Sequence, residues 1–360
     1  MKEKFDVLYV DFMVEDTHKF YCNKLIDTMN KYSTSVVVEK KDYICYSTSL
    51  NHRVIYIKTK ETVNNYPIKA RIAAIFNYIN TIKKIKQFEF NKIIVLGYDP
   101  IVFTLYFHNL LKLGEVYLVQ HHQLDEVASS RIKLKIWNLY KDKVNHIMLD
   151  KAIIDGAIEK FNLDSRRVYY FPIPYVEHCK LSNNNVRNNI VVLCISGSNE
   201  QSQINKLIEI EKKNHFLESN HISIVIKERT SKNATGLRAF RIVEDHLSDA
   251  EYNQLYKECD IVLMLFPQSY KYRCSGTLID AFSYGKKVIS SNITQSAYYS
   301  KHFPSLCTKF DSIEDIGKLI LNISKLDSKS DLKKFSNEFA NIEQKCAKEI
   351  LKTEKFETQE

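Results

Sequence analysis

The residues best placed to do chemistry lie within residues 252–289. In this stretch the apolar run CDIVLMLF predicts a buried strand, PQSYKYRC a polar loop and SGTLIDAFSYG a helix, with Ser275 as its N-cap and Gly285 at its end. The backbone N–H groups at a helix start have no partner within the helix, and the helix dipole favours negative charge there. Glycine at 276 lets a phosphate approach the backbone of Gly276 and Thr277 closely. The sequence therefore predicts an anion site at this helix start.

Three further side chains belong to the same stretch. Asp280 follows one helical turn later, where a carboxylate could accept hydrogen bonds from ribose hydroxyls. Tyr272 and Arg273 stand in the loop that approaches the helix. The simpler alternative is that Ser275 only caps a helix and that Asp280 faces water. Spacing alone leaves both interpretations open.

A second polar group follows a predicted strand, in VQHHQLDE (residues 119–126). His121, His122, Asp125 and Glu126 are residue types that act as general bases or contact a sugar. The alternative is a polar loop in which an aspartate caps a helix.

Other carboxylates could also take a proton from a hydroxyl group. Asp99 stands in GYDP, and Asp11 and Glu15 follow the first predicted strand. The sequence does not choose among these candidate bases.

A basic segment, SSRIKLKIWNLYKDK (residues 129–143), combines five cations with Ile, Leu and the only Trp of the chain. This mixture is typical of a helix that lies on an anionic membrane surface. The alternative is a helix packed on a sheet, with its cations in water.

Short β-rich runs alternate with helical stretches along the whole chain, which is the pattern of βαβ units around a parallel sheet. The predicted strands are Phe5–Val10, Ser35–Val38, Val54–Ile57, Lys92–Leu96, Glu115–Val119, His146–Leu149 and Val168–Phe171 in the first half, and Ile190–Ile195, His221–Ile226, Arg238–Val243, Ile261–Leu265 and Lys287–Ser290 in the second. The predicted helices are His18–Lys31, Ile68–Ile85, Ile101–Leu113, Ala128–Lys143, Lys151–Phe161, Gln201–Lys213, Asp249–Glu258, Gly276–Ser283 and Ile313–Ser324, with a charged helix from Ser330 to about Lys352.

Between the two halves the composition changes to prolines, asparagines and serines. We therefore expect an α/β protein with two Rossmann-like domains that face a central cleft, where small molecules usually bind. The predicted parts are a first domain at 1–178, a linker at 179–189, a second domain at 190–328, and a helix at 329–360 that packs back toward the first domain.

Composition is that of an ordinary globular protein of 360 residues, with 44% hydrophobic and 26% charged residues. The formal charge is +9. Residues 1–180 hold 27 Lys and Arg against 20 Asp and Glu, whereas residues 181–360 hold 25 against 23. A basic first half favours an anionic partner, such as a membrane surface, a phosphorylated substrate or nucleic acid, although AT-rich codon bias would also enrich lysine.

The eight cysteines are scattered and form no CxxC pair, so we expect reduced thiols and no structural zinc. The first residues do not form a signal peptide, and no apolar run is long enough to span a bilayer. The expected location is cytoplasmic, with the possibility of peripheral binding at the inner face of the membrane.

The second half resembles glycosyltransferases of the two-domain GT-B fold. The resemblance rests on AFSYGKKVISS (281–291), which is similar to the Gly-Lys-Pro-Val-Ile-like end of the nucleotide-binding helix, and on DAEYNQLYKECDIVLMLF (249–266) ahead of it. RRVYYFPIPYVE (166–177) resembles the last strand of the first domain as it enters the hinge. The motif-level match covers roughly 40–50 residues of the second domain, while the order of elements agrees over most of the chain.

The resemblance implies roles for single residues. Ser275, Gly276 and Thr277 would bind the donor pyrophosphate, and Asp280 would hold the ribose. The remaining implied contacts are Lys227 and Arg229 with the pyrophosphate, Gly197 in the turn that admits the donor, and His121 or His122 near the donor sugar. We also expect Tyr272 and Arg273, in the approaching loop, to contact the donor.

Two departures from the family pattern stand out. Many retaining members have a glutamate eight residues before the ribose acid, where this chain has Tyr272. The usual glycine-rich turn after the first strand is replaced by VDFMVEDTH. Whether the reaction would retain or invert the anomeric configuration stays open.

The resemblance implies an enzyme that moves a sugar from a nucleotide-diphosphate donor to a saccharide or lipid-linked saccharide, in cell-surface polysaccharide, O-antigen or lipopolysaccharide synthesis. No DxD pair stands at a strand end, so we expect catalysis without a bound metal or other cofactor. Lys227, Arg229, Arg273 and backbone N–H groups would stabilise the leaving diphosphate. The alternatives are a sugar-nucleotide epimerase of the same fold and, from another class, a basic nucleic-acid-binding protein, for which the sequence shows no motif.

Overall fold

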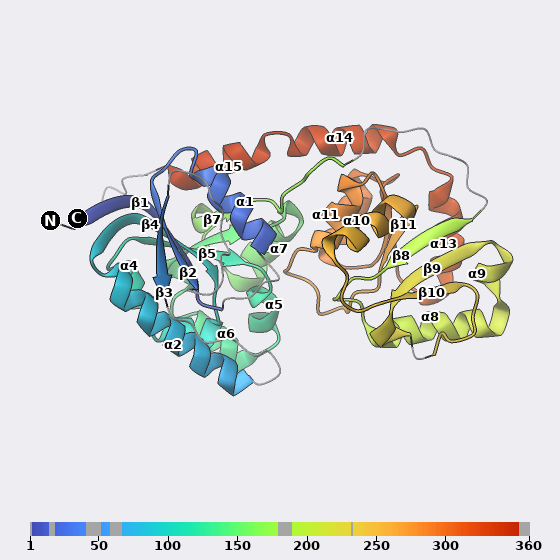
Figure 1. Cartoon of the computed structure of the whole chain (residues 1–360), viewed down its shortest axis with the longest axis horizontal. Helices are drawn as coiled ribbons and strands as arrows, with labels where there is room; N and C mark the ends of the chain where they lie inside the picture. The colour runs from blue at the N-terminus through green and yellow to red at the C-terminus, as the bar shows by residue number, and fades with distance from the viewer. Residues whose placement is uncertain are drawn as a thin grey trace. The chain divides into compact units, whose positions relative to one another are not determined.

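The structure is a computed structural model of the chain, and it describes residues 2–13, 19–40, 52–57, 67–178, 189–231 and 233–352 (Figure 1). These residues form two compact units. The first contains Met1–Pro174, Tyr272–Cys274 and Asn341–Glu360, and the second contains Tyr175–Lys271 and Ser275–Ala340. Except for Asn189, the predicted linker lies outside the described residues.

The first unit is built on a parallel sheet of seven strands in the order β3-β2-β1-β4-β5-β6-β7. Each predicted strand of the first half is confirmed to within a few residues. Runs such as KIIVL are apolar throughout, without alternating polar residues, because helices cover both faces of the sheet. The strands are β1 (Glu3–Asp11), β2 (Ser35–Lys40), β3 (His52–Ile57), β4 (Phe88–Gly97), β5 (Glu115–Gln120), β6 (Asn145–Met148) and β7 (Val168–Tyr170).

Helices cover both faces of this sheet (Figure 1). One face carries α2 (Pro67–Ile85), α3 (Pro100–Thr104), α4 (Phe107–Leu111), α5 (Gln123–Ala128), α6 (Arg131–Trp137) and α7 (Lys151–Phe161). The other face carries α1 (Lys19–Met29) and α15 (Ile342–Leu351). The single helix predicted over 101–113 is wrong, because two short helices form there and Tyr106 between them leaves the helical conformation.

The second unit has a parallel sheet of six strands in the order β10-β9-β8-β11-β12-β13. Its strands are β8 (Ile190–Cys194), β9 (Ile222–Lys227), β10 (Phe240–Val243), β11 (Ile261–Met264), β12 (Lys287–Ser291) and β13 (Cys307–Phe310). Its helices are α8 (Gln201–Asn214), α9 (Phe216–Ser219), α10 (Asp249–Glu258), α11 (Gly276–Ser283), α12 (Thr294–His302), α13 (Ile316–Ser324) and α14 (Lys329–Phe339). We did not expect β13, α9 or α12, because their polar composition hides the apolar pattern of a strand or helix.

The predicted single helix at the end of the chain is wrong. Residues 329–351 form two helices, α14 and α15, and Asn341 between them has a positive φ of 61° that ends the helical path. Cys346, Ala347 and Ile350 of α15 are buried in the first unit's core, beside α1.

The six cysteines in the described part of the chain are free thiols, and Cys45 and Cys179 lie outside it. None of the described helices combines the length and the apolar character needed to cross a bilayer.

A chain of buried hydrogen bonds fixes the carboxyl ends of β4 and β5. Tyr98 donates to Oε1 of Gln120 at 3.0 Å, and Gln120 Nε2 lies 3.0 Å from Nδ1 of His146. His146 Nε2 lies 3.0 Å from the carbonyl oxygen of Lys141. Because a carbonyl only accepts, His146 carries its proton on Nε2 and accepts from Gln120 on Nδ1. Burial lowers the pKa of His146 to about 4.

This pKa predicts a pH dependence of stability. The unfolded chain binds a proton on His146 below about pH 6.5, but the folded protein does not until about pH 4, so stability falls as the pH is lowered through this window. Between pH 7 and pH 5 we expect a loss of about 2 kcal/mol from this group. Urea unfolding measures the free energy of unfolding at each pH, and this free energy should fall more steeply toward pH 5 for the wild type than for His146→Asn. Equal slopes for the two proteins would contradict this assignment.

Candidate functional site

The start of α11 is open, as the sequence predicts. Ser275 occupies the N-cap position with extended backbone, but its side chain makes no capping hydrogen bond. Its N–H donates to Oε1 of the buried Gln295 at 3.0 Å, which fixes the turn. Apart from its chain neighbours and the backbone of α11 itself, no atom lies within 4 Å of the position that a Cβ on Gly276 would take. An anion could therefore reach the backbone at this helix start.

The turn after β8 lies beside α11. The hydroxyls of Thr277 and Ser196 are 3.3 Å apart. Asn199 holds the turn against the end of β11, because its Oδ1 accepts from the N–H of Leu265 at 2.9 Å. A Cβ on Gly197 would lie 3.6 Å from Nη2 of Arg229, so the turn after β8 also meets the end of β9.

The two predicted cations after β9 are positioned by one residue, Asp245. Lys227 Nζ donates to the Asp245 carbonyl at 2.8 Å, and the N–H of Arg229 donates to its Oδ1 at 3.1 Å. Burial, and then the charge of Arg229, lowers the pKa of Lys227 below its usual value. Arg229 Nε also lies 3.8 Å from Asp245 Oδ1, and the Arg229 side chain is 50% exposed, so its guanidinium can still reach an anion.

Asp280 lies one turn inside α11 and is partly buried. Tyr252 on α10 donates to its Oδ2 at 3.0 Å, and Tyr256 lies 3.1 Å from the Tyr252 hydroxyl. Burial raises the pKa of Asp280 to about 6, although the hydrogen bond from Tyr252 opposes the shift. The alternative that Asp280 simply faces water is wrong. Sequence reasoning did not find Tyr252 or Gln295, because neither belongs to a motif.

Tyr272 and Arg273, which we expected at the donor, belong to the first unit, where both contact Asp125. The N–H of Tyr272 donates to Asp125 Oδ1 at 2.7 Å, and Arg273 Nε donates to Oδ2 at 2.6 Å. The Tyr272 ring packs against Phe161. Cys274 follows with its Sγ 3.5 Å from Asp150 Oδ2. Asp125 therefore holds this segment as an ion-pair partner.

The two histidines after β5 differ in their surroundings. His121 is buried, and its Nε2 lies 3.0 Å from the carbonyl of Leu96, which places the proton on Nε2. His122 lies 3.1 Å from Glu126, which Lys133 also contacts at 2.6 Å. Although burial alone would raise the pKa of Glu126, the hydrogen bonds from His122 and Lys133 lower it to about 2.

The remaining carboxylates perform structural tasks. Asp99 caps α3 by accepting from Ile101 and Val102, and it lies 3.4 Å from Arg71. Asp11 ends β1 and accepts from the N–H of Met13. Glu15 lies outside the described residues.

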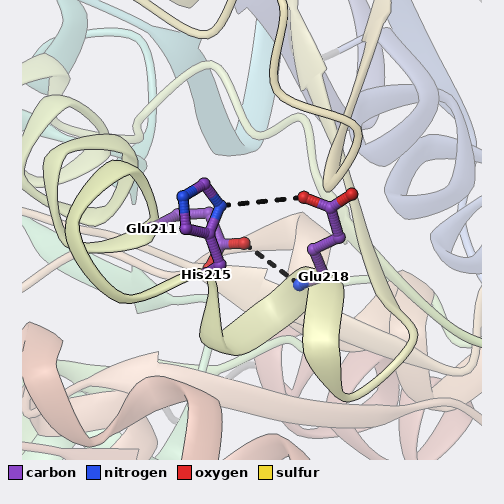
Figure 2. A group of neighbouring side chains, drawn as sticks. All are labelled: Glu211, His215 and Glu218. Atoms are coloured by element: carbon purple, nitrogen blue, oxygen red, sulfur yellow. Dashed lines mark hydrogen bonds and ion pairs between the residues drawn. The ribbon is translucent and has the colours of Figure 1, made fainter.

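One group in the described residues has the side chains of a metal site, namely Glu211, His215 and Glu218 (Figure 2). Both oxygens of Glu211 accept backbone N–H groups at the start of α9, from Leu217 at 2.8 Å and Glu218 at 3.0 Å. His215 Nδ1 lies 3.7 Å from Glu218. The group is thus explained as a cap between α8 and α9.

A cavity of about 240 Å³ lies next to this cap, between α8, α9 and α13. None of the residues predicted from the sequence to act in a site lines it.

Comparison with known proteins identifies the architecture. No protein-family model matches the sequence, and no curated protein sequence matches it. Solved structures do match. Anabaena HepE with UDP and glucose has a TM-score of 0.65 and 11% identity, over 97% of this chain and 100% of the other. WaaG, a glycosyltransferase of lipopolysaccharide biosynthesis, has a TM-score of 0.63 and 10% identity, over 96% of this chain and 99% of the other. Arabidopsis thaliana UGT89C1 with UDP has a TM-score of 0.62 and 8% identity, over 97% of this chain and 99% of the other.

The chain has the GT-B fold. The fold class predicted from the sequence, an α/β protein with two Rossmann-like domains, is confirmed. At these identities the likeness shows the fold only, so activity must be argued from the chain's own residues.

The raised pKa of Asp280 predicts an effect of mutation on stability. In the unfolded chain Asp280 ionises above about pH 4, whereas in the folded protein it ionises only above about pH 6, where the charge is partly buried. The stability of the wild type therefore falls as the pH rises through this window. Asp280→Asn keeps an acceptor for Tyr252 and removes the charge. We expect the variant to be more stable than the wild type at pH 7.5, by up to about 3 kcal/mol, and similar at pH 4. Urea unfolding at both pH values measures this, and an Asn variant that is less stable at pH 7.5 would refute it.

Proposed function

We propose that this protein is a glycosyltransferase that moves a sugar from a nucleotide-diphosphate donor to a saccharide. The observation that carries the proposal is the convergence of three loops at the carboxyl edge of the second sheet. Three groups come together there, namely the open helix start at Gly276, the turn at Ser196 and Gly197, and the side chain of Arg229. Ligands of open parallel sheets bind at this edge.

The chemistry of a diphosphate fits these groups. A diphosphate carries several negative charges, and the uncapped N–H groups of α11 together with the guanidinium of Arg229 supply donors and positive charge. In sugar transfer the bond between the anomeric carbon and the diphosphate oxygen breaks, so negative charge grows on the diphosphate. The same donors then stabilise the leaving group, and the proposal needs no bound metal ion or other cofactor.

Asp280 would accept hydrogen bonds from the ribose of the donor. It lies on α11 one turn from the proposed phosphate contacts, and its ionised form is the better acceptor. Because its pKa is about 6, donor affinity should decline as the pH falls below this value.

For the acceptor's proton we propose His121 as the base. Its contact with the Leu96 carbonyl keeps a proton on Nε2 and orients the ring beyond the carboxyl end of β5. Asp99 and Asp125, two of the other candidate bases, are held by backbone N–H groups and by arginines.

The structural neighbours support this reaction class and suggest its partners. HepE has been solved with UDP-glucose and UGT89C1 with UDP, so a uridine nucleotide is the first donor to try. WaaG acts in lipopolysaccharide biosynthesis, which supports a saccharide or lipid-linked saccharide acceptor and a role in cell-surface polysaccharide synthesis.

The proposal predicts that Gly276→Leu abolishes nucleotide binding without unfolding the protein. The Cβ position at Gly276 is open, so the added side chain fills only the space proposed for the phosphate. A nucleotide at about 100 times its dissociation constant stabilises a protein by about 2.7 kcal/mol, which thermal-shift measurements with UDP, GDP and CMP detect.

Two further variants complete this experiment. Gly156→Ala in α7 is the matched control, because its Cβ would make only an ordinary 3.8 Å contact with Tyr272, and it should bind like the wild type. Arg229→Ala, at an exposed side chain, should bind more weakly. If a nucleotide stabilises the wild type and Gly276→Leu equally, the diphosphate does not bind at α11.

A further inference from the structure

Most of the large exposed apolar side chains in the described residues belong to one part of the first unit. They lie on α2, at the end of α3, and on or just after α6. Figure 1 draws α2 and α6 on the same side of the first sheet. We call this surface the α2–α6 face and define it by Ile68, Ile72, Ile79, Leu105, Ile132 and Leu139.

Helix α2 has apolar residues on two opposite sides. Ala74 and Tyr78 are buried against the sheet. Ile68, Ile72 and Ile79 are 73%, 55% and 39% exposed, and their spacings of four and seven residues put them in one line along the helix. A surface helix needs only one apolar side, so the outward line calls for a partner.

The three helices form a continuous layer. Tyr78 of α2 stacks on Tyr106 and donates to its carbonyl at 2.7 Å. Tyr140, just after α6, donates to the carbonyl of Pro100 at the start of α3. Helix α3 thus lies against both α2 and α6, with Leu105 exposed at its end.

The structure changes the expected role of the basic segment at 129–143. We expected its tryptophan at the membrane, but Trp137 is fully buried against Phe161 and Tyr140. The large apolar residues that this segment exposes are Ile132 on α6 and Leu139 just after it.

The segments that carry these apolar side chains are rich in cations. Residues 67–86 contain five Lys and Arg and no Asp or Glu, and residues 131–143 contain five and one acid, Asp142. Of these ten cations, Lys141 is buried. Lys83 continues the outward line of α2, four residues after Ile79. Two nearby acids, Asp99 and Glu126, pair with Arg71 and Lys133 of this set, and the remaining cations leave the face with a net positive charge.

We propose that the α2–α6 face binds an anionic membrane surface. The exposed isoleucines and leucines would enter the boundary between headgroups and acyl chains, while the lysines and arginines contact lipid phosphates. The positive charge decides against a second copy of this face, since two such faces would repel each other. The inference rests on the described first unit and stands independently of sugar transfer.

Vesicle sedimentation of the full chain tests this proposal. We expect binding to vesicles of phosphatidylcholine mixed with phosphatidylglycerol, much weaker binding to phosphatidylcholine alone, and release by salt. Ile72→Asp and the double variant Lys83→Glu/Lys84→Glu should each weaken binding to anionic vesicles about tenfold or more.

Matched controls come from exposed residues of the second unit. Leu326→Asp and Lys325→Glu/Lys329→Glu change similar side chains elsewhere and should bind like the wild type. Thermal melts of all variants confirm folding. Equal binding of the face and control variants would overturn the proposal, and so would a wild type that binds neither vesicle. A concentration-dependent dimer that only Ile72→Asp abolishes would assign the face to self-association instead.

Discussion

Every strand pairing described in the two sheets is parallel, and the candidate site depends on this constraint. In a parallel sheet all strands end at one edge, so loops that are far apart in the sequence are brought together there. Ser196, Arg229 and Gly276 follow β8, β9 and β11, which are neighbours in the second sheet. A strand inserted in the opposite direction would carry its loop to the other edge and separate these groups.

The same constraint explains why much of the fold follows from the sequence. A strand buried on both faces needs a continuous apolar run, and the runs before Asp99, His121 and Gly276 are of this kind. The helix start at Gly276 was predictable because a small residue after a polar loop is a local signal. Polar helices such as α12, and the break at Asn341, depend on contacts that single segments do not reveal.

The partners of each site residue could not be predicted from the sequence. Arg273 stands two residues before Ser275, which suggested a shared ligand, yet its guanidinium pairs with Asp125, 148 positions away. Asp280 had the spacing of a ribose contact, but the pKa that governs its use comes from burial and from Tyr252 on another helix. Position along the chain indicates which residues share an edge of the sheet, whereas charge partners are set by packing.

The central claim is that the start of α11 binds a nucleotide diphosphate. The most direct test is a crystal structure of the protein with the nucleotide that stabilises it best. The account predicts diphosphate oxygens that accept hydrogen bonds from the N–H groups of Gly276 and Thr277 and lie within ion-pair distance of Arg229. A nucleotide bound elsewhere, with the start of α11 occupied only by solvent, would contradict it.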